Sequence, residues 1–243
     1  MRVPRIYVET PVVPGNDVFL TGAALHHVSK VLRARVGAEV LLFDGTGGEW
    51  RAVLDSIRPD HAQARLVEHV PINRESPLRW ELAQGISRGE RMDYTLQKAV
   101  ELGVAMVHPV MTKRTVVKLQ GEKSEKRREH WQGVARSAAE QSGRTVLPVV
   151  NPVLDLDEFF QRRDDGLMLI LDPQADATID QLSMERPERV FLLAGPEGGF
   201  DDRERADAYR NGATGIRLGP RILRTETAAL VAAALLLARW GDY

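Results

Sequence analysis

Apolar and polar positions follow two different rhythms along the chain, and the rhythm changes near residue 77. In the first 70 residues the apolar positions predict three strands, two of them with the apolar–polar alternation of a half-buried strand. The expected strands span 38–44, 49–57 and 62–70, with one short helix around 22–32. Residues 44–48 (DGTGG) fit a hairpin loop between the first two strands. This part of the chain therefore predicts a small β-rich domain over 1–72.

Beyond a polar stretch bracketed by two prolines at 71–77, strand-like and helix-like segments alternate. The expected strands span 78–84, 104–111, 167–171, 189–194 and 215–218, and the expected helices span 92–102, 122–142, 179–184 and 202–211. Such alternation is typical of a largely parallel sheet with helices on both faces. We therefore expect a second, α/β domain over 78–243. Ligands of such sheets lie beyond the carboxyl ends of the strands, so the loops that follow strands are the places to look for a site.

The composition narrows the chemistry. The chain has 243 residues, 43% hydrophobic and 28% charged, which is ordinary for a soluble globular protein. It contains no cysteine, which excludes disulfides, zinc–thiolate sites, iron–sulfur clusters and cysteine nucleophiles. The longest apolar run, 228–238, is too short to cross a bilayer, and the first residues lack the apolar stretch of a signal peptide. We therefore expect a cytoplasmic protein without a membrane segment.

Charge is balanced overall but not evenly placed. The formal net charge is -1, from 33 basic and 34 acidic residues, which argues against a uniformly basic surface for nucleic acid. Basic residues nevertheless gather between 113 and 128. Two interpretations stay open: a solvated loop and helix face, or a local phosphate-binding patch.

One motif in the second domain suggests a hydrolase, but the rest of the chain does not support it. Residues 85–89 (GISRG) match the nucleophile elbow G-x-S-x-G after a strand. That interpretation requires an acid and then a histidine downstream, yet the last histidine is His130 and the only aspartate between it and Ser87 is Asp93. We therefore reject it. The chain also lacks a P-loop, and no G-x-G-x-x-G follows a strand, so the usual loops for nucleoside triphosphates and NAD are missing.

Two other loops that follow strands are more informative. Residues 195–200 (GPEGGF) come directly after an apolar strand. Their three glycines permit close approaches that a side chain would forbid, and Pro196 stiffens the turn. This segment could be an ordinary tight turn or a loop that offers backbone amides to a ligand.

The second loop, 218–227 (LGPRILRTET), leads into an apolar helix that we expect to be buried on nearly every side. Thr225 is expected to cap this helix through its hydroxyl. Arg224 and Glu226 then lie close to the core, where an unpaired charge is strongly unfavourable. A functional role for the two charges is favoured, and an ion pair with each other or with a neighbour is the alternative.

In their order and spacing, these loops and several short motifs resemble the RsmE family of SPOUT-class methyltransferases, which methylates N3 of a uridine in the decoding region of 16S ribosomal RNA. The resemblance covers nearly the whole chain. Its motifs are RVPRIY at 2–7, HHVSKVLR at 26–33, QKAVELG at 97–103, EQSGR at 140–144 and the two loops. One departure is Thr115, where the family has serine, but the hydroxyl is kept.

The resemblance implies a fold that periodicity does not reveal. It consists of a small N-terminal PUA-like β-barrel for RNA binding and a C-terminal SPOUT α/β domain with a deep trefoil knot, in an obligate homodimer. It also implies S-adenosylmethionine as the cofactor, held largely by backbone groups of the knotted loops, and no metal. By motif, the cofactor-binding residues are Leu171, Asp172, Pro173, Leu193, Gly195, Pro196, Gly198, Gly199, Leu218, Gly219, Ile222, Leu223, Thr227 and Ala228.

The chemistry of the acceptor suggests the remaining roles. Uracil N3 carries a proton at neutral pH, and its place on the Watson–Crick edge requires an unstacked base. We expect Arg224 to stabilise the developing uracil anion and Glu226 or Glu197 to accept the proton. Candidate RNA contacts, each of which could instead be an ordinary surface charge, are Arg5, Arg88, Arg91, Lys98, Arg114 and Arg144.

The expected partner is 16S ribosomal RNA within the small ribosomal subunit. Two alternatives stay open. One is a SPOUT enzyme that acts on transfer RNA or on a ribose 2′-hydroxyl, and the other is a non-catalytic RNA-binding assembly protein.

Overall fold

The fold is described from a computed structural model of the chain, for residues 3–117 and 119–243. The chain divides into two compact units. The first combines Met1–Glu75 with Ala139–Leu147, and the second combines Ser76–Ala138 with Pro148–Tyr243. The sequence places the boundary between residues 72 and 78, but it gives no sign that the later segment Ala139–Leu147 belongs to the first unit.

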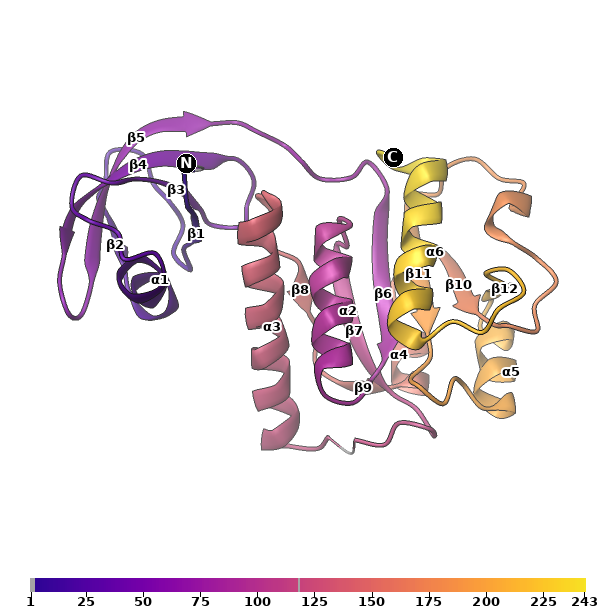
Figure 1. Cartoon of the computed structure of the whole chain (residues 1–243). Coiled ribbons are helices and arrows are strands. Elements are labelled where there is room, and N and C mark those ends of the chain that lie inside the picture. The colour runs from indigo at the N-terminus through magenta and orange to yellow at the C-terminus, as the bar shows by residue number, and fades with distance from the viewer. Residues whose placement is uncertain (1–2, 118) are drawn as a thin grey trace. The chain divides into compact units, whose positions relative to one another are not determined.

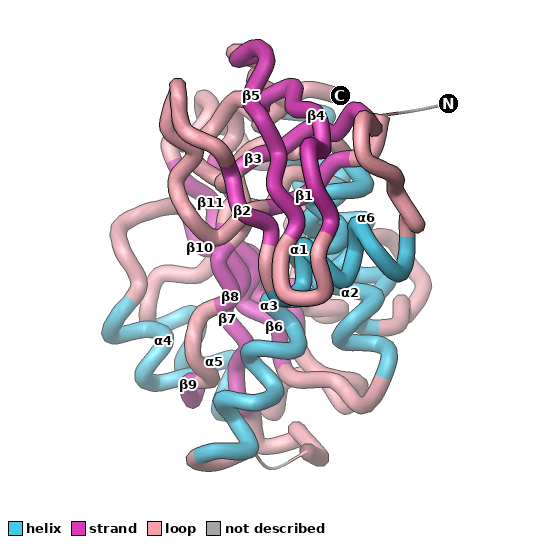
Figure 2. The backbone as a smooth tube through the Cα atoms, turned by 90° about the vertical axis from the view of Figure 1, so that its left-hand side faces the viewer, coloured by secondary structure: helices cyan, strands magenta, loops and turns pink. Residues whose placement is uncertain are grey.

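The first unit is a curled five-stranded sheet with a short helical segment (Figure 2). Its strand order is β1-β3-β4-β5-β2, with only the β1–β3 pair parallel. The strands are β1 (Arg5–Tyr7), β2 (Val18–Leu20), β3 (Glu39–Phe43), β4 (Glu49–Ile57) and β5 (Ala62–Val70). The helical segment is α1 (Gly22–His26), continued by a π-helical turn at His27–Val31. The three longer strands lie where the apolar pattern predicts them, two of them with clear alternation, whereas β1 and β2 have three residues each and are too short to show a period.

The second unit is built on a parallel sheet, as the alternation of strands and helices predicts. Its order is β12-β10-β11-β6-β7-β8, and β9 also pairs with β7. The strands are β6 (Arg79–Gly85), β7 (Met106–Met111), β8 (Val149–Val150), β9 (Leu154–Asp155), β10 (Leu167–Leu171), β11 (Arg189–Ala194) and β12 (Thr214–Ile216). Every one of these pairs is parallel. The carboxyl ends of the long central strands therefore meet at one edge of the sheet (Figure 1).

Helices cover both faces of this sheet. They are α2 (Glu90–Glu101), α3 (Glu122–Ser142), α4 (Leu156–Arg162), α5 (Asp202–Arg210) and α6 (Thr225–Trp240). On one face, α2 and α6 lie side by side (Figure 1), and the Trp80 indole of β6 donates to Leu102 O at the end of α2. On the other face, α4 and α5 close an apolar core that includes Phe159, Phe191 and Ala208.

Two helix predictions in this unit need correction. The segment expected as a helix at 179–184 forms only a single 3-10 turn at Ile179–Gln181. Helix α6 is not buried on every side, because Val231 and Leu235 are 37% and 45% exposed. Helix α4 was not predicted, since its seven residues span only two turns.

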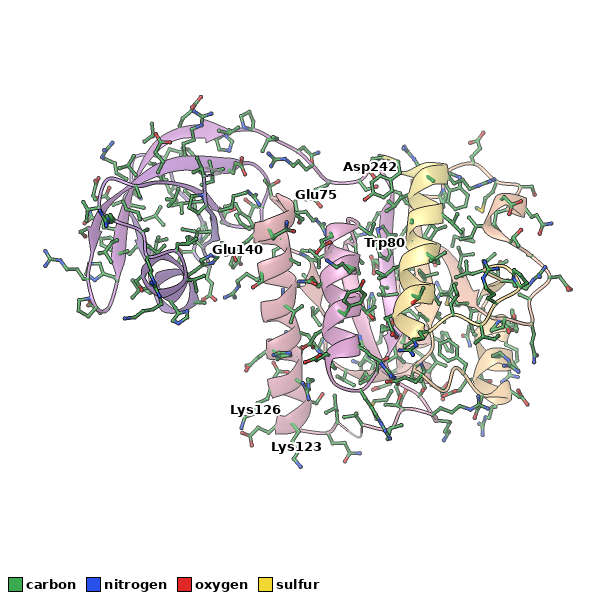
Figure 3. All side chains as sticks on the ribbon, viewed as in Figure 1. Glu75, Trp80, Lys123, Lys126, Glu140 and Asp242 are labelled. Carbon is green, nitrogen blue, oxygen red and sulfur yellow. The ribbon has the colours of Figure 1, made fainter. Side chains whose placement is uncertain are left out.

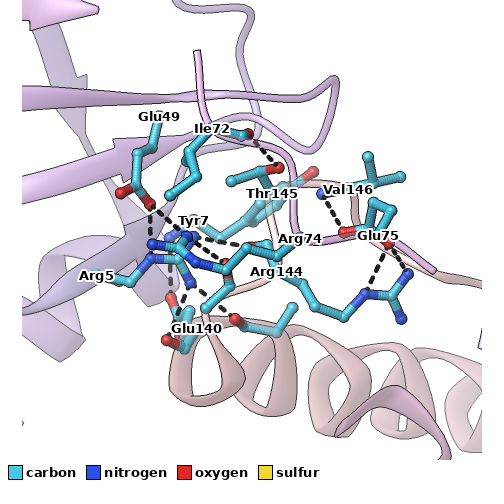
Figure 4. Close-up of polar contacts among 12 residues, drawn as sticks. Arg5, Tyr7, Glu49, Ile72, Arg74, Glu75, Glu140, Arg144, Thr145 and Val146 are labelled. Carbon is cyan, nitrogen blue, oxygen red and sulfur yellow. Dashed lines mark hydrogen bonds and ion pairs between the residues drawn. The ribbon is translucent and has the colours of Figure 1, made fainter. Parts of the chain in front are cut away.

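A buried arginine holds the last turn of α3 inside the first unit (Figure 4). Arg5 is 6% exposed, and its Nε lies 2.9 Å from Oε2 of Glu49. Its other nitrogens donate to the carbonyl oxygens of Ala139, Glu140 and Arg144 at 2.9, 3.2 and 2.8 Å. A guanidinium is well suited to this place, because the C-terminal carbonyls of a helix carry partial negative charge and lack helical partners.

Arg144 is buried in the same region, where it pairs with Glu75 (Figure 4). Arg5 and Arg144, which the sequence suggests as RNA contacts, thus have their guanidinium groups engaged inside the protein. The structure supports a role for both in folding the first unit.

We expect Arg5→Met to lower the free energy of unfolding by about 3 kcal/mol, because the buried Glu49 carboxylate loses its nearest cation and three carbonyl groups lose a donor. Urea unfolding followed by circular dichroism measures this. The control is Arg65→Met, which removes the exposed Arg65–Asp55 pair and should change stability by less than about 1 kcal/mol. Equal losses in the two variants would contradict the anchoring role of Arg5.

Candidate active site

A cavity of about 490 Å³ opens at the carboxyl ends of β10, β11 and β12, where open parallel sheets bind their ligands. Its volume lies within the range of sites for small molecules. Three loops form its walls: 171–173 after β10, 194–200 after β11, and 216–224 after β12. The first turn of α6 completes it with Thr225, Glu226 and Ala228.

The loop after β11 is held by a close approach of two backbones. A Cβ on Gly85, at the end of β6, would lie 2.5 Å from both N and Cδ of Pro196. A Cβ on Gly195 would lie 2.9 Å from Cα of Gly199, and Gly199 itself has a φ of +67°. Glycine at these positions is therefore a steric requirement, and the loop is not an exchangeable tight turn.

Asp172 stabilises the loop after β10 through hydrogen bonds. It is 4% exposed, and its carboxylate accepts from the Tyr209 hydroxyl at 2.7 Å and from the amide of Gln174 at 2.9 Å. Burial and the negative charge of Asp172 raise the pKa of Tyr209 to about 12, so this hydroxyl stays a hydrogen-bond donor. The Asp172 side chain thus helps to fix the conformation of the loop.

Glu197 connects the loop after β11 to the start of α2. Its Oε1 accepts from the amide of Arg88 at 2.9 Å and from the Arg91 guanidinium at 3.1 Å. Burial raises the pKa of Glu197, but the backbone hydrogen bonds and the nearby Arg91 outweigh it, so the net pKa is lowered. A carboxylate stabilised in this way is a weak base.

Glu226 has a different environment from Glu197, although both line the cavity. Its Oε2 is buried and has no hydrogen-bond partner among the described residues. The ion pair with Arg224 that the sequence left open is not formed in the described part of the chain, and Arg224 is exposed at the rim. The structure therefore places a buried, unsatisfied carboxylate oxygen beside the cavity, next to an arginine without an acidic partner in that part of the chain.

Thr225 does not cap α6 as expected. The N-cap position is occupied by Arg224, and no side chain caps it. The Thr225 hydroxyl instead lies 2.5 Å from the carbonyl oxygen of Gly195. The first turn of α6 is therefore bonded to the loop after β11.

The structure brings together most of the residues expected to bind the cofactor. Those that line the cavity are Leu171, Asp172, Pro173, Gly195, Pro196, Gly198, Gly199, Leu218, Gly219, Ile222, Leu223 and Ala228. Leu193 lies instead within the buried sheet, and Thr227 is exposed on α6, so neither is part of the lining.

The three candidate catalytic residues Arg224, Glu226 and Glu197 all reach the cavity. Among the basic candidates, Arg91 and Arg114 line it, and Arg114 donates to Gly198 O at 2.7 Å. Lys98 is paired with Glu101 on α2 at 2.7 Å.

Several lining residues were not foreseen. They are Ala194, Phe200, Arg205, Ile216, Arg217 and Thr225. Ile216 and Arg217 could have been found, because both lie within the strand predicted at 215–218 and directly before the second loop. Arg205 could not have been found from the sequence, because it belongs to α5 and only the tertiary fold brings it to the cavity. There its Nε lies 3.9 Å from Oδ2 of Asp172.

Comparisons with known proteins agree with this architecture. The family model described as the RNA methyltransferase domain matches residues 74–237, and the one described as the RNA methyltransferase PUA domain matches 20–67. The ribosomal RNA small subunit methyltransferase E of Bacillus subtilis is 31% identical over 221 residues, covering 88% of this chain and 86% of that protein.

Two solved structures match over their whole length. A Legionella pneumophila protein solved with bound SAM has a TM-score of 0.96 and 39% identity, with 100% of both chains covered. The ribosomal RNA small subunit methyltransferase E of Neisseria gonorrhoeae, bound to S-adenosyl methionine, has a TM-score of 0.92 and 35% identity, again covering 100% of both chains. The chain therefore belongs to the ribosomal RNA small subunit methyltransferase E family.

The described residues form neither a cluster suited to a metal ion nor a membrane-spanning helix. No group of three or more histidine, aspartate or glutamate side chains there is placed to hold a metal ion. No helix in that part of the chain is long and apolar enough to cross a membrane.

We expect Gly85→Ala to lower the free energy of unfolding by about 1–3 kcal/mol, because its methyl group would overlap Pro196 and push the loop after β11 away from β6. Thermal unfolding measures the change. Gly133→Ala in α3 is the control: it meets nothing within 4 Å, so it should be neutral or stabilising by up to about 1 kcal/mol. If the two variants were equally stable, the close approach would not be a constraint.

Proposed function

We propose that this protein transfers a methyl group from S-adenosylmethionine to N3 of a uridine in the decoding region of 16S ribosomal RNA. The observation that carries the proposal is the strand-end cavity, in which glycine-rich loops meet the buried unsatisfied oxygen of Glu226. Membership of the methyltransferase E family agrees with it.

The cavity fits the cofactor in size and chemistry. Its volume of about 490 Å³ suits a ligand that combines a nucleoside with an amino acid. Leu171, Ile216 and Leu218 offer apolar surface for a purine, while Gly195, Gly198 and Gly199 leave backbone groups accessible to polar atoms. When bound, S-adenosylmethionine supplies an already activated methyl group.

The two candidate proton acceptors, Glu197 and Glu226, differ in their hydrogen bonds. Glu197 is held by Arg88 and Arg91, and its pKa is lowered, so it is suited to fixing the loop. Glu226 has one oxygen without a hydrogen bond from the described residues, and that oxygen is buried beside the cavity. We therefore assign to Glu226 the role of accepting the N3 proton, and to Arg224 the stabilisation of the uracil anion.

Contacts with RNA phosphates are assigned to basic residues around the cavity. Arg88, Arg91 and Arg114 come from the segments beside the loop after β11, and Lys98 follows on α2. Lys123 at the start of α3 is also exposed, whereas Lys126 is paired with Glu122 (Figure 3). Arg5 and Arg144 are left out, because their guanidinium groups are buried in the first unit.

Further features implied by the family resemblance belong to this proposal. A C-terminal trefoil knot is in keeping with a cavity whose walls come from the loops after β10, β11 and β12 and from α6. The exposed apolar side chains Val231 and Leu235 on α6 suit burial in a homodimer. The small ribosomal subunit in the cytoplasm is the expected setting of the substrate.

The direct test is to incubate the protein with radiolabelled S-adenosylmethionine and small ribosomal subunits that lack the modification. The labelled nucleoside is then identified by mass spectrometry. We expect 3-methyluridine at one position of 16S RNA, and no label on transfer RNA offered in parallel. Label on a ribose or on another base would contradict the proposed position. Absence of both methyl transfer and cofactor binding would favour a non-catalytic RNA-binding protein.

We expect Glu226→Gln to lower kcat by about 100-fold or more, because it removes the proton acceptor and keeps the size of the side chain. Its affinity for S-adenosylmethionine should change little, and raising the pH should restore part of the rate, because more uracil is then ionised. Single-turnover methyl transfer measures the loss, with the exposed Glu188→Gln as control. A rate within a few-fold of the unaltered protein would exclude Glu226 as the acceptor.

A further inference from the structure

Gln84 is a fully buried polar side chain in the part of the sheet nearest the cavity. It is 0% exposed and precedes Gly85 at the end of β6. Its Nε2 lies 2.9 Å from the Thr225 hydroxyl, 3.0 Å from Gly85 O and 3.3 Å from Gly195 O. These partners belong to three segments that are far apart in sequence: β6, the loop after β11, and the first turn of α6.

The amide of Gln84 acts only as a donor here. Two of its three partners are carbonyl oxygens, which cannot donate, so the nitrogen must face them. Its Oε1 is buried and has no partner among the described residues. An unsatisfied buried acceptor is unfavourable by about 1–3 kcal/mol, so an apolar residue of similar shape would suit a purely structural position better.

The Thr225 hydroxyl completes the connection. It receives a hydrogen bond from Gln84 and donates its own hydrogen to Gly195 O at 2.5 Å. The spacing between Gly195 and the first turn of α6 is therefore set by one amide and one hydroxyl. Gly195 belongs to the glycine-rich wall of the cavity, and Glu226 directly follows Thr225.

We propose that Gln84 is a positioning residue for the reaction, which fixes the distance between the cofactor-binding loop at Gly195 and the carboxylate of Glu226 through Thr225. Gln84 itself does not line the cavity. This inference rests on the proposed function of the site. It adds a residue from the centre of the sheet to a site that is otherwise built from loops and a helix end.

Two nearly isosteric variants test the proposal. Gln84→Leu removes the amide, and Thr225→Val removes the hydroxyl while keeping the branched shape. We expect each to raise the Kd for S-adenosylmethionine by about tenfold in calorimetry, because a loop that is no longer fixed must be ordered on binding. We expect kcat to fall as well, because Glu226 loses its alignment. Thr225→Ser, which keeps the hydroxyl, should restore both values.

The double variant and a matched glutamine show whether the effect is local. If Gln84 and Thr225 act through one link, the double variant Gln84→Leu with Thr225→Val should raise the Kd by about tenfold in total, as each single variant does, and not by about 100-fold. Gln132 is the control, since it also bonds two backbone groups of this unit, Pro148 O and the amide of Val150, each at 2.9 Å and away from the cavity. Gln132→Leu should lower thermal stability and leave the Kd within about twofold.

A cofactor-free measurement adds a readout that does not depend on activity. In hydrogen–deuterium exchange, amides at 195–199 and 225–228 should exchange faster in Gln84→Leu than in the unaltered protein, and should not do so in Gln132→Leu. Should Gln84→Leu fail to fold, Thr225→Val and Thr225→Ser still decide the matter.

The possible outcomes separate this inference from the proposed function. If the unaltered protein binds S-adenosylmethionine and the Kd is unchanged in both Gln84→Leu and Thr225→Val, the positioning role is overturned and the function stands. An equal loss of affinity in Gln132→Leu would also overturn it, because the effect would then follow stability alone. If the unaltered protein does not bind the cofactor, the proposed function falls and this inference falls with it.

Discussion

The site depends on the contact between the end of β6 and the loop that follows β11. Parallel pairing brings the carboxyl ends of the central strands to one edge, but it does not decide how the loops there are arranged. The backbone of Gly195 and Pro196 lies so close to Gly85 that no side chain fits between them. This close approach fixes the position of the loop beside β6, and the loop together with those after β10 and β12 lines the cavity.

The hydrogen bonds around this cavity distinguish residues that hold the loops in place from residues that retain an unpaired oxygen. Asp172 and Glu197 are acidic residues of the lining whose oxygens accept from several protein donors, so their charge is used to hold loops in place. Glu226 and Gln84 each retain a buried oxygen without a partner among the described residues. Glu226 lines the cavity, where we propose that it accepts the substrate proton, whereas Gln84 does not line it and bonds its neighbours through its nitrogen. Side chains of similar type thus take different roles because their partners differ.

The sequence predicts what depends on local periodicity or on a compact motif. The central strands, the long helices and the two glycine-containing loops all appear where the pattern places them, and the loops meet because they follow parallel strands. It does not predict contacts that only the tertiary fold creates. Nothing local indicates that Arg5 binds the carbonyls at the end of α3, or that Thr225 bonds to Gly195 and not to its own helix. Gln84 looks like any polar residue in a strand, and its role appears only when three distant segments meet.

A protein with a net charge of -1 can still bind RNA if some of its basic side chains are exposed and not paired with a carboxylate. The buried arginines Arg5 and Arg144 are paired with carboxylates, and those pairs stabilise the first unit and add little to the long-range field. At the rim of the cavity, Arg221 and Arg224 are exposed and have no acidic partner among the described residues. Their charge therefore remains available to a polyanion at the rim of the cavity. Under the proposed function, this local imbalance of charge, and not the total charge, would direct RNA to the site without making the whole surface attractive to nucleic acid.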